Sequence, residues 1–421
     1  MTDIFLPVLL ELKPFDPASK HASPCPQVTG APYALKGVFT PEEHGKRFLS
    51  PELDLSVPRE EILEQFERFG AGLGLPRGEV RRAFDAAERA SEDFRKAQRA
   101  EGAKVLSEMR EQGQKGVVFL SRPYSSLDGG LNMGVPREVR KHGWQALPMD
   151  FLALEEGRRD PHMAADDTWY NQGKILQAAE IVADDPDLYP VYITPFRCGP
   201  DAYIIKKLEA RCRAAGKPLL VLEIDEHTSA AGFKTRIDAY ITSIKLANEA
   251  AQRALEKAET AEAFAASGRP APKPMEFLTL AELKGKKTFI PRMSDHIVVL
   301  AGALRAAGIN AEAFKPATDA ALDEGRKHSN GKECLPYPVL MGEAIVGIRE
   351  QIKAGTKPED IAVMFYKSDG SCRFSQYTSA LEMSLHEAGF PGLRVANLAG
   401  RSKSPSVPNH FVPSLRLTVN I

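Results

Sequence analysis

The sequence is poor in the features that would assign it to a specialised class of protein. Its 421 residues include five cysteines, no Cys-x-x-Cys pair and two tryptophans. Five cysteines are too few, and odd in number, for a disulfide scaffold. No apolar run approaches the roughly 18 residues that a membrane-spanning helix needs. The 55 basic and 56 acidic residues give a net charge of −1, so we expect neither nucleic acid nor a membrane as a partner.

Familiar catalytic and nucleotide-binding motifs are missing as well. There is no G-x-G-x-x-G, no G-x-x-x-x-G-K-[ST], no G-x-S-x-G and no H-E-x-x-H, so nothing points to nucleotide binding or to the usual hydrolases. The start is apolar around residues 4–10, but Asp3 and Glu11 flank it and no Lys or Arg precedes it. It predicts a buried first strand over residues 4–12 rather than a signal peptide. We therefore expect a cytoplasmic location.

Hydrophobic periodicity predicts an α/β protein with two lobes. Short apolar runs alternate with helical stretches, which is typical of mostly parallel sheets flanked by helices on both faces. The expected strands cover residues 116–120, 145–149, 188–194 and 218–224 in the first lobe, and 287–291, 310–314, 361–366 and 393–398 in the second. Folds of this kind bind ligands in a crevice outside the carboxyl ends of the strands.

Composition divides the chain into five parts. A sequence rich in proline at residues 267–274 is the best candidate for a linker, and the last residues lack a clear period. The predicted parts are an N-terminal segment (1–57), a first α/β lobe with a helical lead-in (58–265), a linker (266–286), a second α/β lobe (287–400) and a tail (401–421).

Four of the five cysteines lie in predicted loops beside glycine or proline. Cys198 and Cys372 come after expected strands, whereas Cys25 and Cys334 lie in separate loops. Thiolates gathered from distant loops are what an iron–sulfur cluster or a zinc ion requires. The spacing alone also agrees with free, mostly buried thiols, which is what lone cysteines usually are. Cys212 lies within an expected helix and is interpreted as an ordinary helix residue.

Two loops at predicted strand ends carry candidates for lining a crevice. Arg122 and Tyr124 belong to a Ser-Arg-Pro-Tyr sequence after the first strand of the first lobe. Arg292, Asp295 and His296 occupy the matching position in the second lobe. These side chains are candidates for contacts with a substrate or a partner. The alternatives are a structural arginine in a turn constrained by proline, a helix N-cap at Ser294 or Asp295 and a structural histidine.

Six segments in order make the chain resemble the acyl-CoA dehydratase activase-related proteins, relatives of 2-hydroxyglutaryl-CoA dehydratase and its activator. Together the segments span nearly the whole of residues 1–400. They are Cys-Pro-Gln-Val-Thr-Gly-Ala-Pro-Tyr from Cys25, Ser-Arg-Pro-Tyr with Asn-Met-Gly around Arg122 and Asn132, Phe-Arg-Cys-Gly-Pro-Asp-Ala around Cys198, Ile-Pro-Arg-Met-Ser-Asp-His up to His296, Ser-Asn-Gly-Lys-Glu-Cys-Leu-Pro around Cys334, and Gly-Ser-Cys-Arg-Phe-Ser-Gln-Tyr around Cys372.

The resemblance implies flavodoxin/Rossmann-like lobes around a [4Fe–4S] cluster held by three cysteines. Carried over to this chain, the ligands are Cys198, Cys334 and Cys372, with Cys25 as a fourth ligand or a second-site thiol. The family also includes double-cubane cluster proteins. A separate activator ATPase of the actin and sugar-kinase type would supply one low-potential electron. The chain would use or relay it in anaerobic metabolism, either as a lyase that dehydrates an acyl-CoA through a radical or as a reductase of a small molecule.

The chain also departs from the family. The ATPase domains of longer relatives are missing, no thioester pocket is identifiable, and residues 401–421 do not continue the pattern of the relatives. We therefore expect one subunit of a complex with a related subunit or a second copy of itself, or a fragment of a longer protein. The alternatives to a redox protein are a non-catalytic α/β binding subunit and a zinc–thiolate protein.

Overall fold

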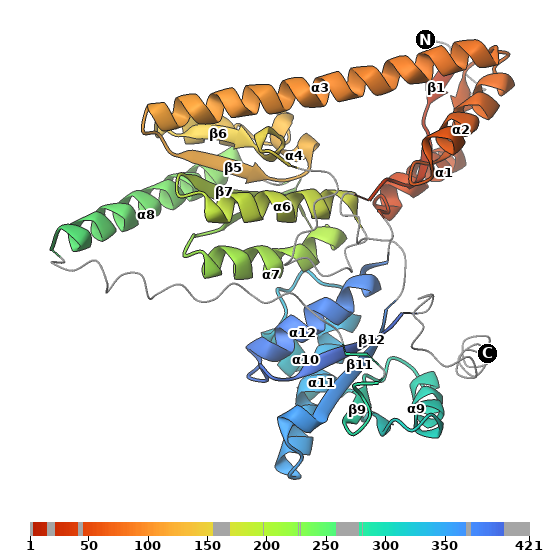
Figure 1. Cartoon of the computed structure of the whole chain (residues 1–421), viewed down its shortest axis with the longest axis vertical. Coiled ribbons are helices and arrows are strands. Elements are labelled where there is room, and N and C mark those ends of the chain that lie inside the picture. The colour runs from red at the N-terminus through yellow and green to blue at the C-terminus, as the bar shows by residue number, and fades with distance from the viewer. Residues whose placement is uncertain are drawn as a thin grey trace. The chain divides into compact units, whose positions relative to one another are not determined.

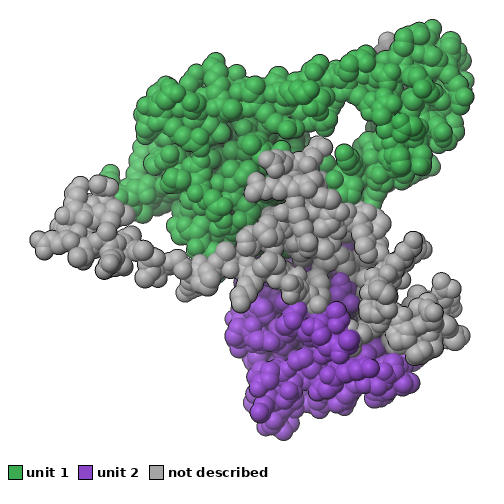
Figure 2. Space-filling model, viewed as in Figure 1, with its two compact units in different colours: residues 1–163, 169–273 green, residues 164–168, 274–421 purple. Residues whose placement is uncertain are grey.

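The computed structural model shows an α/β protein with two compact units (Figures 1 and 2). Unit 1 comprises residues 1–163 and 169–273, and unit 2 comprises residues 164–168 and 274–421. The structure describes residues 3–14, 22–40, 45–154, 169–196, 198–225, 227, 229–257, 278–279, 281–367 and 372–399. The predicted tail and most of the predicted linker lie outside these residues.

The main sheet of unit 1 has four parallel strands in the order β6-β5-β7-β8. The strands are β5 (Gly116–Leu120), β6 (Gln145–Pro148), β7 (Leu188–Pro195) and β8 (Leu220–Ile224). The helices that follow β5 and the later strands are α4 (Pro123–Leu127), α5 (Val135–Lys141), η2 (Met149–Phe151), α6 (Tyr170–Asp184), α7 (Gly199–Ala214) and α8 (Ala230–Lys257). The predicted strands of this lobe are confirmed, because continuous apolar runs of this length form strands that are buried on both faces.

Alternate residues of these strands face two separate hydrophobic cores. Val118 and Leu120 pack with side chains of α6 and α7 and with Met109 of the long helix α3 (Arg77–Glu111). Val117 and Phe119, one residue out of phase, pack with side chains of α5 and α8. Because successive side chains of a strand point to opposite faces, this pattern places helices on both sides of the sheet (Figure 1).

The N-terminal elements of unit 1 form two short parallel strand pairs. The elements are β1 (Asp3–Phe5), β2 (Val8–Glu11), α1 (Pro26–Val38), β3 (Arg47–Leu49), β4 (Glu52–Asp54) and α2 (Arg59–Gly72). β1 pairs with β3, and β2 pairs with β4. The prediction of one strand over residues 4–12 is wrong, because Pro7 has no N–H to continue a ladder and the chain divides there into β1 and β2. Helix α1, directly after Cys25, is also an element that the sequence reasoning missed.

Unit 2 contains a second sheet of four parallel strands in the order β10-β9-β11-β12. Its elements are β9 (Lys287–Ile290), α9 (His296–Ala306), β10 (Ala311–Ala313), α10 (Asp319–Lys327), α11 (Pro336–Lys353), η4 (Pro358–Asp360), β11 (Ile361–Lys367), η5 (Arg373–Gln376), α12 (Tyr377–Glu387) and β12 (Arg394–Ala399). All four predicted strands are present. Helix α10 was not predicted, since its sequence is polar and only nine residues long.

The two sheets repeat one topology. In each sheet, the strand that comes first in the sequence (β5 or β9) occupies the second position. The next strand in sequence (β6 or β10) pairs with one side of it. The third strand (β7 or β11) pairs with its other side, and the fourth (β8 or β12) lies beyond the third. The sequence reasoning detected no internal repeat, because a shared strand order does not require shared residues. The predicted fold class of two lobes with mostly parallel sheets flanked by helices is confirmed. Among the described residues, no helix has both the length and the apolar character needed to cross a bilayer.

Candidate functional site

The candidate residues of unit 1 lie where the strand order of its sheet reverses. The chain runs from β5 to β6 on one side and then returns to β7 on the other side of β5. Open α/β sheets bind ligands outside the carboxyl ends of the strands at such a switch point. Arg122 follows the carboxyl end of β5, and Cys198 follows that of β7. Two residues singled out separately in the sequence are therefore neighbours in the fold.

A buried hydrogen-bond network joins Arg122 to Cys198. Arg122 Nη1 donates to Cys198 Sγ at 3.1 Å. The same guanidinium donates from Nη1 to Asp201 Oδ2 at 3.2 Å and from Nη2 to Asp201 Oδ1 at 2.8 Å. Thr194 Oγ1 donates to Asp201 Oδ2 at 2.6 Å. Arg122 is 8% exposed and Asp201 is 2% exposed, so removal of either partner would leave an uncompensated buried charge.

The electrostatics of this network keep Arg122 charged and Cys198 neutral. Burial opposes the charge of Arg122, but the negative charge of Asp201 outweighs burial and raises the pKa of the guanidinium. Burial also raises the pKa of the Cys198 thiol, and the carboxylate of Asp201 adds to this, while Arg122 acts in the opposite direction. The Cys198 thiol thus keeps its proton at neutral pH.

The loop after β5 carries the other features of this edge of the sheet. Tyr124 on α4 is half exposed, and burial raises its pKa while Arg122 lowers it. Met133 has a φ of 50°, a left-handed conformation that costs energy in a residue with a side chain. Asn132 supports this turn, because its Nδ2 donates to Ser126 O at 2.8 Å and its Oδ1 accepts from Gly134 N at 2.9 Å. Strain of this kind is concentrated at functional sites in proteins.

The switch point of unit 2 lies at the carboxyl ends of β9 and β11. Arg292 follows β9, as Arg122 follows β5, and Cys372 follows β11 as the residue before η5. Arg292 Nη2 donates to Asp295 Oδ1 at 2.6 Å, and the Asp295 side chain is 91% exposed. Asp295 is the N-cap residue of α9, but its side chain makes no capping bond. His296 Nδ1 lies 3.3 Å from Ser294 Oγ.

Cys334 is held by an aromatic cluster of unit 2. Its Sγ lies 2.7 Å from Tyr377 Oη. Tyr377 is 3% exposed. Its ring contacts the rings of Tyr337, Phe374 and Phe365 at centroid distances of 5.3, 5.2 and 6.0 Å. The phenol oxygen therefore has a fixed position beside the sulfur.

The four loop cysteines share one structural position, the start of a helix. Cys25, Cys198 and Cys372 are the N-cap residues of α1, α7 and η5, and Cys334 lies two residues before α11. Cys25, Cys198 and Cys334 are partly exposed and Cys372 is exposed. Their chemistry and access therefore suit ligands of an iron–sulfur cluster. Cys212 is buried within α7, and burial raises its pKa to about 11.

The cysteines are divided between the units. Cys25 and Cys198 belong to unit 1, and Cys334 and Cys372 belong to unit 2. Within the part of the chain that the structure describes, no group of three or more His, Cys, Asp or Glu side chains is placed to hold a metal ion.

Three residues of this candidate site escaped the sequence reasoning. Asp201 comes three residues after Cys198 and anchors Arg122. Tyr377 comes five residues after Cys372 and contacts Cys334. Glu343 accepts from Arg292 N with Oε1 at 2.6 Å although it lies on α11. Asp201 and Tyr377 could have been suggested by their closeness in sequence to a cysteine. Glu343 lies 51 residues from its partner Arg292, so the sequence around it gives no signal of the contact.

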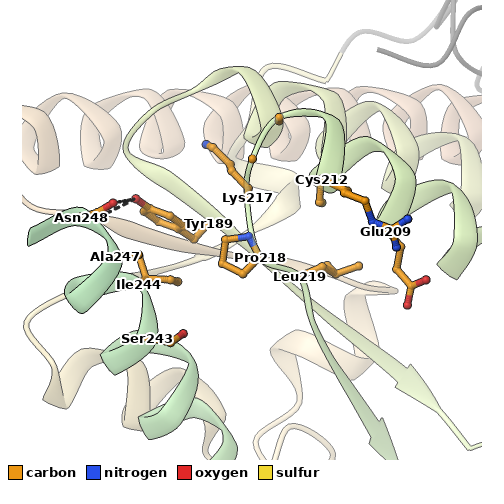
Figure 3. A pocket seen from close by; sticks show the side chains of 13 residues that line it. Tyr189, Glu209, Cys212, Lys217, Pro218, Leu219, Ser243, Ile244, Ala247 and Asn248 are labelled. Atoms are coloured by element: carbon orange, nitrogen blue, oxygen red, sulfur yellow. Dashed lines mark hydrogen bonds between the residues drawn. The ribbon is translucent and has the colours of Figure 1, made fainter. Parts of the chain in front are cut away.

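A cavity of about 820 Å³ lies at the other edge of the unit 1 sheet (Figure 3). It is lined by Tyr189, Lys217 and Pro218, which lie near the amino ends of β7 and β8, and by α7 and α8. Lys217 Nζ donates to the carbonyls of Val182 and Leu188, and burial lowers its pKa to about 8. Lys217 therefore binds the end of α6 rather than a ligand. The cavity is separate from the candidate residues at the carboxyl edge.

Comparison with known protein families gives one match, over residues 1–152, to the CoA enzyme activase uncharacterised domain. This range ends at η2 and includes Cys25, Arg122 and Tyr124. No curated protein and no solved structure matches the chain. Residues 1–152 are therefore similar to the CoA enzyme activase uncharacterised domain, which supports the predicted resemblance to the acyl-CoA dehydratase activase-related proteins.

Proposed function

We propose that this chain is an iron–sulfur protein of the 2-hydroxyacyl-CoA dehydratase and activase type. The observation that carries the proposal is the matching place of two cysteines in the two units. Cys198 follows the third strand of its sheet and Cys372 follows the third strand of the other, each at the start of a helix. Both positions are at switch points, where folds of this type bind ligands. The family match over residues 1–152 supports the same assignment.

The proposed ligands of a [4Fe–4S] cluster are Cys198, Cys334 and Cys372, with Cys25 as a fourth ligand or a second-site thiol. Bound there, the cluster would supply one-electron chemistry. The residues of the chain would hold these sulfurs close to the starts of α7, α11 and η5.

The proposed partners follow from the same assignment. An activator ATPase of the actin and sugar-kinase type would deliver a low-potential electron, and a related subunit or a second copy of the chain would complete the complex. The electron would serve the radical dehydration of an acyl-CoA or the reduction of a small molecule. The CoA enzyme activase domain at residues 1–152 supports a partner of the activator type.

The proposal is tested by measuring iron and acid-labile sulfide per chain after anaerobic purification. We expect about four iron atoms per chain in the wild type. The variants Cys198→Ala, Cys334→Ala and Cys372→Ala should each lose most of this iron. Cys212→Ala is the matched control and should keep it, since Cys212 is 1% exposed within α7. Far-UV circular dichroism of each variant checks that it is folded.

Other metal contents have distinct meanings. About eight iron atoms per chain would indicate a double cubane with further thiolates, and Cys25→Ala would then show whether Cys25 is one of them. Zinc in place of iron, lost in the same variants, would replace the redox proposal with a zinc–thiolate site. Neither metal in the wild type would contradict the proposal and favour a binding subunit.

A further inference from the structure

We propose that a cavity of unit 2 beside Glu343 binds a small organic cation, which carries a primary ammonium group on a short apolar chain. The cavity has a volume of about 210 Å³ and lies among β9, β10, the loop that follows β10, and α11. All of its lining residues belong to unit 2. The inference needs no metal and goes beyond the proposed function, so either can fail without the other.

Glu343 supplies the recognition group of this cavity. It lies on α11, lines the cavity and is 4% exposed. Its Oε1 accepts from Arg292 N at 2.6 Å, but its Oε2 has no hydrogen-bond partner among the described residues. Buried polar atoms of this kind nearly always have a partner in proteins. The terminal torsion of a glutamate side chain is broad, so a small rotation would direct Oε2 at a donor held in the cavity.

Other polar side chains that line the cavity already have partners. Thr318 is the N-cap residue of α10, and its side chain accepts from a backbone N–H of the first turn. Gln351 Oε1 accepts from Lys287 Nζ at 2.8 Å. The buried acceptor that is left over is therefore a carboxyl oxygen of Glu343. A ligand that completes its hydrogen bonding must bring a donor, and a charged donor gives the stronger bond.

The charges around the cavity favour a cation. Glu312 and Glu350 are exposed lining residues. Among the residues that line the cavity, Lys315 is the only one with a positive charge, and its Nζ donates to Glu350 Oε2 at 2.7 Å. Acidic groups are thus in excess, because Glu312 and Glu343 have no such counter-charge in the lining. A field of this sign attracts an ammonium group and repels a carboxylate.

The walls and the size of the cavity suit a short apolar chain. The rings of Phe289 and Phe314 are stacked with their centroids 5.0 Å apart, and these side chains are 2% and 5% exposed. Both rings and Val346 line the cavity. Since an apolar cavity of about 150 Å³ holds one benzene molecule, a volume of about 210 Å³ suits a ligand of about six to eight non-hydrogen atoms.

The test titrates the full chain with pentylammonium, which has this size and charge. Carbon-13 methyl NMR signals of Ala317 and Val346, assigned with Ala317→Ser and Val346→Ile, report on the cavity. We expect saturable shifts in the millimolar range, as a ligand this small allows. 1-Pentanol and pentanoate carry the same chain with a neutral or a negative head group and should bind at least about tenfold more weakly.

Three results of this titration would overturn the inference. The first is no saturable shift with pentylammonium. The second is binding of 1-pentanol as tight as that of pentylammonium, because the cavity would then recognise the chain and not the charge. The third is tighter binding of pentanoate, because the charge preference would then have the opposite sign.

Glu343→Gln shows whether the buried carboxyl is the recognition group. It should weaken the binding of pentylammonium about tenfold or more, which is what a hydrogen bond to a charged group contributes. Glu312→Gln is the matched control, because it removes an exposed carboxyl from the same cavity. Water screens such a group, so its effect should stay below about threefold. Equal effects of the two substitutions would overturn the role of Glu343, and circular dichroism checks that both variants are folded.

A pH series gives a second readout. Burial raises the pKa of the Glu343 carboxyl to about 7, and an ammonium ion binds the ionised form. The affinity for pentylammonium should therefore rise about tenfold from pH 6 to pH 8 and then stay level. The other charged groups that line the cavity or contact Glu343 are Glu312, Lys315, Glu350 and Arg292. Glu343→Gln keeps all four and should show no such rise. The same rise in this variant, or none in the wild type, would overturn the inference.

Discussion

Replacing Gly342 by alanine should destabilise unit 2 by about 3 kcal/mol, because overpacking of a tight contact typically costs this much. α10 and α11 cross so closely that only a glycine fits at the point of contact on each helix. These glycines are Gly325 on α10 and Gly342 on α11. A Cβ on Gly342 would lie 1.6 Å from Ala321 O, and a Cβ on Gly325 would lie 1.8 Å from Pro338 O. Both obstacles are backbone atoms, which cannot move aside as a flexible side chain could. Cys334 lies in the loop that connects these two helices. Moving the helices apart would therefore displace a proposed ligand.

The loss is measured by hydrogen exchange of peptides from α10 and α11, which should exchange faster in Gly342→Ala. Trp144 and Trp169, both in unit 1, provide an internal reference through their fluorescence. The matched control is Gly302→Ala in α9, where the nearest atom is Arg305 Nη2 at 3.8 Å. That substitution should stabilise by up to about 1 kcal/mol, because alanine favours a helix over glycine. Unchanged protection in Gly342→Ala would contradict the close crossing.

Replacing Glu343 by glutamine should stabilise the protein at pH 8 by up to about 3 kcal/mol, while leaving it nearly unchanged at pH 4. Glu343 is 4% exposed, and burial raises the pKa of its carboxyl from 4.5 to about 7 although Arg292 opposes this. Its Oε1 accepts from Arg292 N, but its Oε2 is buried with no hydrogen-bond partner among the described residues. A charge there is costly because neither water nor a donor satisfies that oxygen.

The direction of the pH effect follows from proton binding. Between pH 4.5 and pH 7 the folded chain keeps a proton on Glu343 that the unfolded chain has released, so raising the pH favours unfolding. The stability from this group is fully present below pH 4.5 and lost as the pH rises through 7. Glutamine cannot ionise. The difference between variant and wild type should therefore grow from pH 4.5 to 7 and then stay level.

The measurement is urea unfolding at a series of pH values, followed by circular dichroism. Glu350→Gln is the control on the same helix, since Glu350 forms a partly exposed pair with Lys315 at 2.7 Å. It should change stability by less than about 1 kcal/mol. If Glu343→Gln were less stable than the wild type at pH 8, the carboxylate would be ionised and held by a donor. The account of a stranded buried oxygen would then be wrong.

Sequence patterns predicted the elements of both sheets well. Strand β5 matches its prediction residue for residue, and β7 begins at the predicted residue and ends one residue later than predicted. Both are long or uniformly buried elements, in which one period dominates. The misses have equally local reasons. Pro7 divides the first strand, and α10 is too short and polar to show its period.

The sequence predicted some residues of the candidate site but not how they are arranged. The sequence named Arg122 and Cys198 separately, from a turn after one strand and a loop after another. Their hydrogen bond spans 76 residues, and Asp201, which orients the pair, was not singled out. Contact at that separation depends on which strands become neighbours in the sheet, and local periodicity carries no information about strand order.

The sequence by itself determined the α/β class, the strands and most of the helices, and which cysteines lie in loops, because these depend on short-range periodicity and on glycine and proline. Only the tertiary structure decided that two sheets share one strand order and that Cys198 and Cys372 lie at equivalent switch points. It also decided that Arg122 and Tyr377 are directed at sulfur atoms. These depend on long-range packing, which brings buried polar groups together with partners that are far away in sequence.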